Sequence, residues 1–208
     1  DKRIRLALKE KEILLQEVHH RVKNNLQVIS SLMNLQKSFV DDPKLTQILE
    51  ESQSRITTMS YIHETLYRHK DFSSISFAEY LKNLSINLIN SYSTPDCDVK
   101  LKTLLEDVFL TLDQAIPIGL IVNELVSNAL KYAFIGKKTG AVTLRAAKVF
   151  DKIEIEVRDN GTGLPENFDL NKGDSLGIYL IQALTEQLSG ELVVKSTKQG
   201  GVGSSFLI

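Results

Sequence analysis

The sequence of 208 residues has one cysteine, no tryptophan and no long apolar run. A single cysteine, Cys97, cannot form an internal disulfide, which favours a reducing compartment. No stretch is apolar enough to cross a bilayer, and the N-terminus lacks the charged-then-apolar pattern of a signal peptide. The formal net charge of -1 argues against nucleic acid or an anionic membrane as a partner. We therefore predict a cytoplasmic location for this stretch of chain and no nucleic-acid partner.

The composition is that of a globular protein, since 42% of the residues are hydrophobic and 25% are charged. A chain of this length can hold one large domain or two small ones. It begins inside a helical pattern and stops in the strand-like Phe206-Leu207-Ile208. We interpret it as part of a longer protein, in which any sensor domain or membrane anchor lies outside this sequence.

Residues 1–40 contain no glycine or proline, and their apolar residues recur in alternating steps of three and four. This spacing predicts a long amphipathic helix, which Asp41-Asp42-Pro43 ends before a second apolar stripe begins. Two such helices form an antiparallel hairpin with little core of its own. We favour a homodimer with a four-helix bundle over a hairpin folded onto its own second domain. The first stripe contains Leu15, Val18, Val22, Leu26, Ile29 and Met33, and the second contains Leu45, Ile48, Ile56, Met59, Ile62 and His63.

The pattern changes after a polar linker at residues 68–75, so we place the domains at 1–70 and 76–208. Helices over one face of a mixed sheet are expected in the second domain, which makes it an α/β sandwich. The helical patterns cover residues 77–92, 114–134 and 175–188, and strand-like segments occur within 99–112, 142–147, 152–158, 191–196 and 204–208.

Two adjacent histidines lie on different sides of the first predicted helix. With Val22 at the centre of the apolar stripe, His19 lies about 60° away and His20 about 160° away, in solvent. Asn24 shares the outward face with His20, and Glu17 lies one turn before it. An exposed imidazole beside a carboxylate can lose a proton and attack phosphorus, so His20 is the candidate nucleophile and the other two are candidate orienting residues. A solvated helix face that contains histidine by chance is the alternative; a metal site is disfavoured because adjacent histidines on a helix diverge.

The predicted helix 114–134 carries three polar residues at i, i+4 and i+7, namely Glu124, Asn128 and Lys131. Asn128 offers a neutral oxygen to Mg²⁺, and Lys131 can neutralise phosphate. Glu124 can orient a water or act as a further metal ligand. The alternative is that these residues are only the solvent side of an amphipathic helix.

The strand pattern at 152–158 is followed at once by Asp159-Asn160-Gly161-Thr162-Gly163. A plain turn is one interpretation. The functional one is that Asp159 accepts a hydrogen bond from the adenine amine, while Gly161 and Gly163 let the backbone approach the base.

Two further glycine-containing segments complete the pattern. Ser175-Leu176-Gly177 opens a helix whose amides could meet phosphates. Residues 200–205, with Gly203 and Ser204, form a tight return into the last strand. GxxxxGK[ST] and GxGxxG are both absent, which excludes a P-loop and disfavours a dinucleotide fold. The chain also lacks a Ser-His-Asp order and a cysteine nucleophile context.

In combination, these motifs resemble those of sensor histidine kinases. The downstream half resembles the GHKL (gyrase, Hsp90, histidine kinase, MutL) ATPase domain. The upstream half resembles the variant dimerisation and phosphoacceptor domain with a His-Arg-Val-Lys-Asn-Asn core, shared with the HWE kinases. There the histidine before Arg-Val-Lys accepts the phosphate, which maps to His20. Asn128, Lys131 and Tyr132 match the N box, residues 159–163 and 175–177 match the two glycine boxes, and residues 201–206 match the closing glycine motif.

The resemblance implies an ATP:protein-histidine phosphotransferase that uses ATP and Mg²⁺. It further implies a response regulator receiver domain as partner and a sensor domain upstream. Glu124 stands where many of these kinases have the first N-box asparagine, as is usual in the variant group, and residues 164–174 are a short ATP lid. Two other functions remain open: a non-catalytic phosphotransfer or dimerisation module with a relic nucleotide fold, and a GHKL kinase that phosphorylates a protein serine.

Overall fold

The computed structural model describes residues 2–68, 77–92, 97–106, 108, 110–165, 168–170, 176–196 and 204–207. The chain divides into two compact units, residues 1–73 and 74–208. The first is helical and the second is an α/β domain with a mixed sheet, which is the predicted fold class. No helix of the described residues is long and apolar enough to cross a bilayer.

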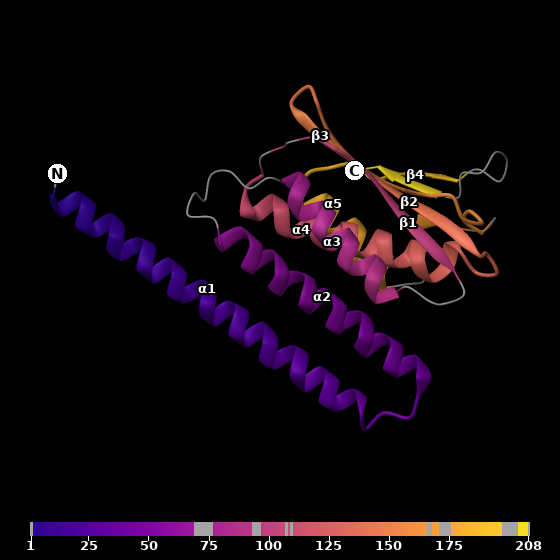
Figure 1. The fold of residues 1–208 in the computed structure, drawn as a ribbon, viewed down its shortest axis with the longest axis horizontal. Coiled ribbons are helices and arrows are strands. Elements are labelled where there is room, and N and C mark those ends of the chain that lie inside the picture. Colours follow the sequence, from indigo (N-terminus) through magenta and orange to yellow (C-terminus); the bar gives the residue numbers. More distant parts are fainter. Residues whose placement is uncertain are drawn as a thin grey trace. The chain divides into compact units, whose positions relative to one another are not determined.

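The first unit is an antiparallel hairpin of α1 (Lys2–Lys37) and α2 (Pro43–Arg68) (Figure 1). Asp42 caps α2, because its Oδ1 accepts a hydrogen bond from the Lys44 N–H at 2.8 Å. Pro43 occupies the first helical position, where its missing N–H and fixed φ are favourable. An ion pair between Lys37 and Glu50 joins the two helices near the turn.

The apolar stripe of α1 is only partly covered by α2. Leu26 and Met33 are half-buried, whereas Val18 and Ile29 are 52% and 43% exposed. Within one hairpin, Val18 and Ile29 of the predicted apolar stripe are therefore not covered. The reason is geometric, since a single neighbouring helix covers only one side of α1. The exposed apolar strip consists of Val18, Val28, Ile29, Leu32 and Leu35 on α1, Phe39 in the turn, and Leu45 and Ile48 on α2.

The second unit contains a mixed sheet in the order β1-β2-β3-β5-β4. β1 and β2 are parallel, whereas the β2–β3, β3–β5 and β5–β4 pairs are antiparallel. The last strand in the sequence is thus inserted between two earlier ones. The strands are β1 (Asp98–Leu105), β2 (Thr139–Val149), β3 (Lys152–Asp159), β4 (Val193–Ser196) and β5 (Ser204–Leu207).

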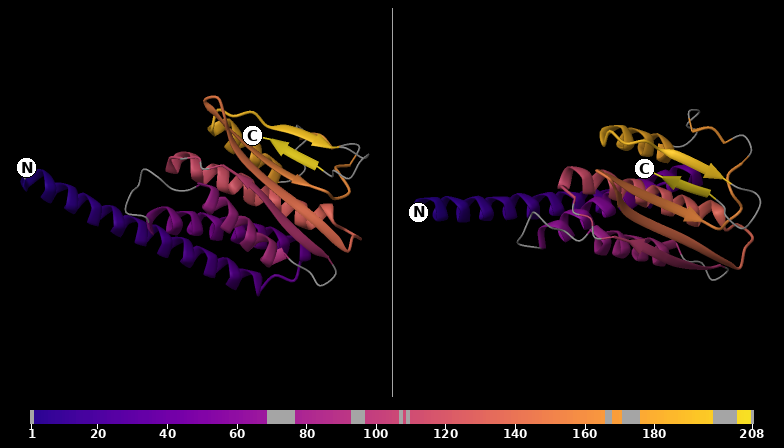
Figure 2. Two further views of the ribbon diagram at one scale, coloured as in Figure 1. Left: turned by 45° about the horizontal axis from the view of Figure 1, so that its top comes forward. Right: turned by 90° about the horizontal axis from the view of Figure 1, so that it is seen from above.

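Three helices cover one face of this sheet (Figure 2). They are α3 (Phe77–Tyr92), α4 (Leu112–Asn128) and α5 (Leu176–Gln187), and α4 packs between the other two. Alternate residues of β2, such as Val142 and Leu144, are fully buried, because successive side chains of a strand point to opposite faces. The core therefore lies between the sheet and α4, where Ile121 and Val122 are also fully buried.

The end of α4 departs from regular α-helix. Residues Ala129–Ala133 form a π-helical turn, η1, that continues directly from Asn128. Single π-helical turns inside helices are rare and are frequently found at functional sites. The sequence predicted an uninterrupted helix here, because no residue type marks a π turn. The turn lies inside the segment that contains Lys131 and Tyr132.

Candidate active site

The carboxylate of Asp159 stabilises the loop that follows β3. Asp159, the last residue of β3, is 4% exposed, and its Oδ1 accepts a hydrogen bond from the Gly161 N–H at 2.8 Å. A carboxylate has further acceptor positions besides this one, so Asp159 can both shape the loop and receive a donor from a ligand. The Ala141 N–H donates to Asn160 Oδ1 at 2.7 Å, and Lys137 Nζ donates to the Asn160 carbonyl at 3.0 Å. These bonds fix the loop to β2 and to the turn before it.

The same loop is fixed to the π-helical turn. The Thr162 N–H donates to the Ala133 carbonyl at 2.9 Å. A Cβ atom on Gly161 would lie 2.2 Å from that carbonyl oxygen, so the loop can approach the turn only because residue 161 is glycine. Gly163 has a φ of 78°, which also favours glycine. The absence of a side chain at Gly161 thus serves the contact with Ala133, a role that the sequence did not indicate.

The N-box residues lie along the end of α4 and through η1. Glu124 is buried, with 5% exposure, and its Oε1 accepts a hydrogen bond from Asn123 Nδ2 at 3.4 Å. Asn128 and Lys131 are half-buried, and Tyr132 is 55% exposed. Because Ala133 follows Tyr132 directly and holds the loop after Asp159, the structure brings the loop and the N-box segment together.

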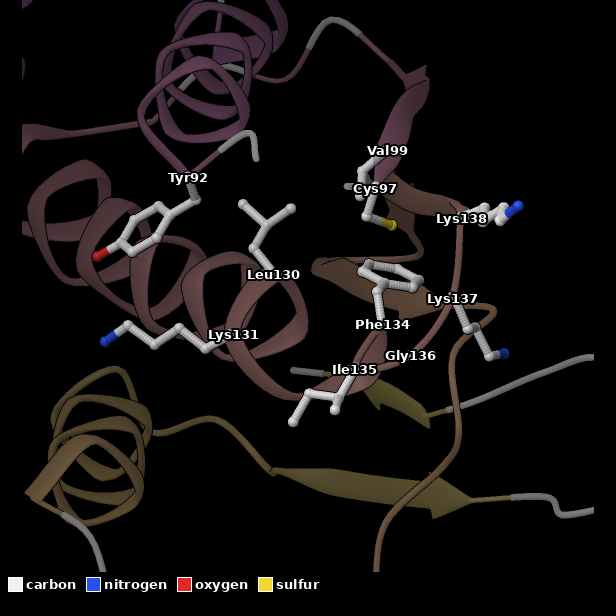
Figure 3. A pocket seen from close by; sticks show the side chains of 10 residues that line it. All are labelled: Tyr92, Cys97, Val99, Leu130, Lys131, Phe134, Ile135, Gly136, Lys137 and Lys138. Carbon is white, nitrogen blue, oxygen red and sulfur yellow. The ribbon is translucent and has the colours of Figure 1, made fainter. Parts of the chain in front are cut away.

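Lys131 also contacts an aromatic ring (Figure 3). Its Nζ lies 5.6 Å from the centroid of Tyr92, the last residue of α3, within the range of a cation–π interaction. The two residues line one end of a cavity of about 470 Å³, and Cys97 and Phe134 lie at its other side. A lysine charge is thus held at the edge of the N-box segment.

The remaining predicted residues are described only in part. Leu176 is exposed and Gly177 is buried at the start of α5, and Ser175 and Gly203 lie outside the described residues. Ser204 begins β5, where it pairs with Ser196 of β4. The Leu164 N–H donates to Ser196 Oγ at 2.9 Å, so the chain leaving the first glycine loop meets the end of β4.

The donor set fits Mg²⁺ better than a metal that needs a protein cage. Among the residues that the structure describes, no group of three or more His, Cys, Asp or Glu could hold a metal ion. Mg²⁺ commonly takes only one or two protein oxygens and fills its octahedron with phosphate and water. The amide of Asn128, with the carboxylate of Glu124 one turn before it, would supply oxygens of that kind.

The phosphoacceptor candidate lies on the hairpin. His20 is exposed, and His19 is half-buried on the side toward α2. Glu17 Oε1 accepts a hydrogen bond from Arg21 Nε at 2.8 Å, with both side chains largely exposed. Such an exposed pair contributes little to stability. Asn24 is exposed one turn after His20.

His63 of α2 was missed as a functional candidate. Its ring centroid lies 5.9 Å from that of His19, with the ring planes tilted by 35°. Burial lowers the pKa of both imidazoles, and for His19 the charges of His63 and His20 lower the pKa further. The ion pair of Lys23 Nζ with Glu64 Oε2, at 3.0 Å, lies next to this contact. The only signal in the sequence was a histidine within the second apolar stripe.

Comparison with known families identifies both units. Residues 17–92 match the histidine kinase family model HisKA_2. Residues 113–208 match the family of histidine kinase-, DNA gyrase B- and HSP90-like ATPases. The chain therefore belongs to the histidine kinases that join a HisKA_2 domain to a GHKL-type ATPase domain.

Individual relatives agree with this assignment. Sensor histidine kinase PdtaS of Mycolicibacterium smegmatis is 31% identical over 197 residues, which cover 94% of this chain and 39% of that protein. Blue-light-activated histidine kinase 2 of Erythrobacter litoralis is 28% identical, over 91% of this chain and 54% of that protein. The solved histidine kinase domain of E. litoralis EL346 superposes with a TM-score of 0.68 at 25% identity, covering 96% of this chain and 91% of that one. This chain thus spans about half or less of the length of these full-length relatives.

Proposed function

We propose that this chain transfers the γ-phosphoryl group of ATP to His20 and then passes it to an aspartate of a response regulator receiver domain. The observation that carries the proposal is the Thr162–Ala133 hydrogen bond, which joins the Asp159 loop to the N-box segment of an ATPase domain. The first unit of the same chain presents an exposed histidine. A candidate nucleotide site and a candidate nucleophile are thus both present.

Different residues of the nucleotide site bind the adenine, the phosphates and the Mg²⁺ of the substrate. Asp159 accepts a hydrogen bond from the exocyclic amine of adenine, and Tyr132 offers an exposed ring beside it. Lys131 neutralises phosphate charge, as a lysine point charge does in many phosphate sites. Mg²⁺ held by Asn128, with Glu124 behind it, would neutralise charge on the phosphates during transfer.

The transfer itself needs a neutral imidazole. An imidazole nitrogen of His20 forms a bond to the γ-phosphorus, the bond from that phosphorus to the β–γ bridging oxygen breaks, and ADP leaves with the electron pair. The imidazole proton goes to solvent, to which His20 is exposed. Asn24 and Glu17 orient the ring, and Arg21 holds Glu17 in place on one side of it. Catalysis then consists mostly of positioning and charge neutralisation.

The exposed apolar strip of the hairpin is the proposed dimer surface. Val18, Ile29 and Leu32 on α1 and Leu45 and Ile48 on α2 are all at least 43% exposed. Exposed large apolar side chains gathered on one element pair mark a candidate interaction site. A second copy of the hairpin would cover the strip and complete a four-helix bundle. We place the sensor domain in the part of the protein that lies beyond this sequence.

Two variants test the phosphoacceptor role and the nucleotide-binding role separately. His20→Ala removes the nucleophile, so we expect no labelling from γ-labelled ATP and unchanged nucleotide affinity. Asp159→Ala removes the adenine acceptor, so we expect weaker nucleotide binding and, as a consequence, weak labelling. A His20→Ala enzyme that labels fully overturns the assignment and points to another acceptor, such as a serine. Wild-type protein that neither binds nor hydrolyses ATP would be the relic scaffold.

A further inference from the structure

Two consecutive residues of α2 contact α1 on both sides of His20 in the sequence. His63 contacts the ring of His19, the residue directly before His20, at a centroid distance of 5.9 Å. Glu64 forms the 3.0 Å ion pair with Lys23, three residues after His20. Both contacts lie within the hairpin unit, so they do not depend on the placement of the ATPase domain.

These two contacts fix the rotation of α1. His19 and Lys23 are four residues apart and therefore lie on the same face of the helix. Each residue of a helix is turned about 100° from the one before it, so a helix held at His19 presents His20 in one direction only. The exposed Arg21–Glu17 pair lies on α1 alone and cannot set this rotation relative to α2.

We propose that His63 is a positioning residue for phosphoryl transfer, which acts through its contact with His19 to fix the direction of His20. The inference rests on the proposed function and goes beyond it by assigning a role to a residue of α2. His63 does not touch the reacting atoms in this account. Its loss lets α1 rotate or separate locally, so His20 meets the γ-phosphorus in a productive orientation less often.

The charges around the pair make it sensitive to acid. His20 and Lys23 on α1 are the titratable and cationic neighbours of the pair, and Glu64 on α2 is the anionic one. Glu64 already forms an ion pair with Lys23. A proton on either imidazole places a charge in a partly buried site, and protons on both place two positive charges on rings whose centroids are 5.9 Å apart, which favours separation of the rings. Burial, which lowers the pKa of both groups, acts in the same direction.

The test measures autophosphorylation of the full chain for wild type, His63→Ala, His63→Phe and Thr57→Ala. Thr57 is an exposed residue of α2, which makes its variant the matched control. We expect His63→Ala to lower kcat roughly tenfold to a hundredfold, as small misplacements of reacting groups do, with KM for ATP unchanged. His63→Phe retains a ring against His19 and should recover most of kcat. It should also shift the acid limb of the pH–rate profile, because one titrating group of the pair is gone.

The outcomes separate this inference from the function on which it rests. A wild-type chain that labels, with His63→Ala labelling at the same rate and with the same pH profile, overturns the role of His63 alone. A loss of kcat that His63→Phe does not recover at any pH, accompanied by lost helicity, indicates a merely structural residue and also overturns it. A wild-type chain that forms no phosphohistidine overturns the proposed function and this inference with it.

Discussion

The backbone N–H of Thr162 donates a hydrogen bond to the carbonyl of Ala133 at 2.9 Å. This bond joins the loop that carries Asp159 to the π-helical turn that carries Lys131 and Tyr132. The proposed adenine acceptor and the proposed phosphate lysine are thus positioned by one contact between two segments that are distant in the sequence. The contact requires glycine at position 161.

Replacement of Gly161 by alanine tests this requirement. The new Cβ would lie 2.2 Å from the Ala133 carbonyl oxygen and 2.5 Å from its Cβ, so the loop must move away from the turn. Overpacking of this kind typically costs about 1–3 kcal/mol. We expect a lower melting temperature and at least tenfold weaker ATP binding by calorimetry.

A second glycine provides the control. Gly136 has a φ of 76°, but a Cβ added there would have no atom within 4 Å. Gly136→Ala therefore adds backbone strain, of about 1–2 kcal/mol, without displacing the loop. Equal losses of ATP affinity in the two variants would contradict the proposed role of the Gly161–Ala133 contact.

The Asp159→Asn variant separates the structural role of Asp159 from its role in ligand binding. The amide oxygen can still accept the hydrogen bond from the Gly161 N–H, so we expect the melting temperature to stay close to that of wild type. The loss of the negative charge weakens a charge-assisted hydrogen bond to adenine, worth about 1.5–3 kcal/mol. Equilibrium binding should show roughly tenfold or greater loss of ATP affinity. Unchanged affinity would remove Asp159 from the adenine site.

Lys131 and Tyr92 are predicted to act on phosphate and not on the base. Lys131→Met removes the ammonium group, so ATP affinity should fall about tenfold while adenosine affinity stays the same, because only ATP carries phosphate charge. Tyr92→Leu removes the ring under Nζ and should have a smaller effect in the same direction, since an exposed cation–π contact is worth about 0.5–1 kcal/mol. Competition binding with ATP and with adenosine measures the ratio of the two affinities in each variant. Parallel losses for ATP and adenosine would contradict this division of roles.

The regular elements and several candidate residues could be predicted from local pattern. The apolar period placed α1 and α2, and the helical wheel separated half-buried His19 from exposed His20. The pattern over residues 77–92 coincides with α3. The strand predicted at residues 152–158 is β3, which extends one residue further and ends at Asp159. These features depend on neighbours within a few residues in the sequence.

Features that depend on distant contacts were not predicted. The π-helical turn has no residue signature, and the insertion of β5 between β3 and β4 is set by pairing across the sheet. The exposure of Val18 depends on which side of α1 receives α2. The His19–His63 contact likewise follows from the register of two helices. The sequence around a histidine in an apolar stripe does not indicate which residue it contacts.

The hairpin is predicted to lose stability in mild acid. The pKa of His19 and of His63 lies below the ordinary value of 6.5 in the folded chain, so the unfolded chain binds protons first as the pH falls. Stability is therefore full above about pH 6.5 and decreases below it, until the folded pKa values are reached. Hydrogen exchange of α1 and α2 amides, corrected for intrinsic rates, should show lower protection at pH 5.5 than at 7.5. Protection that does not change in wild type, or that falls equally in His63→Phe, would contradict this linkage.

The exposed apolar strip predicts a change of oligomeric state. Leu32 is 54% exposed on α1, and Leu32→Lys places a charge at the centre of the proposed dimer surface. We expect sedimentation velocity to show a shift from dimer toward monomer. Phe150→Ser, at a position that is 92% exposed in the other unit, is the control and should leave the mass unchanged. A wild-type chain that is already monomeric at high concentration would refute the four-helix bundle for this chain.

We predict that His20 receives the γ-phosphoryl group of ATP. The most direct test incubates the purified chain with γ-labelled ATP and Mg²⁺ and then exposes the labelled protein separately to acid and to alkali, with His20→Ala beside it. We predict label that survives alkali, is lost in acid and is absent from His20→Ala. Label that survives acid, or that persists in His20→Ala, would contradict the account.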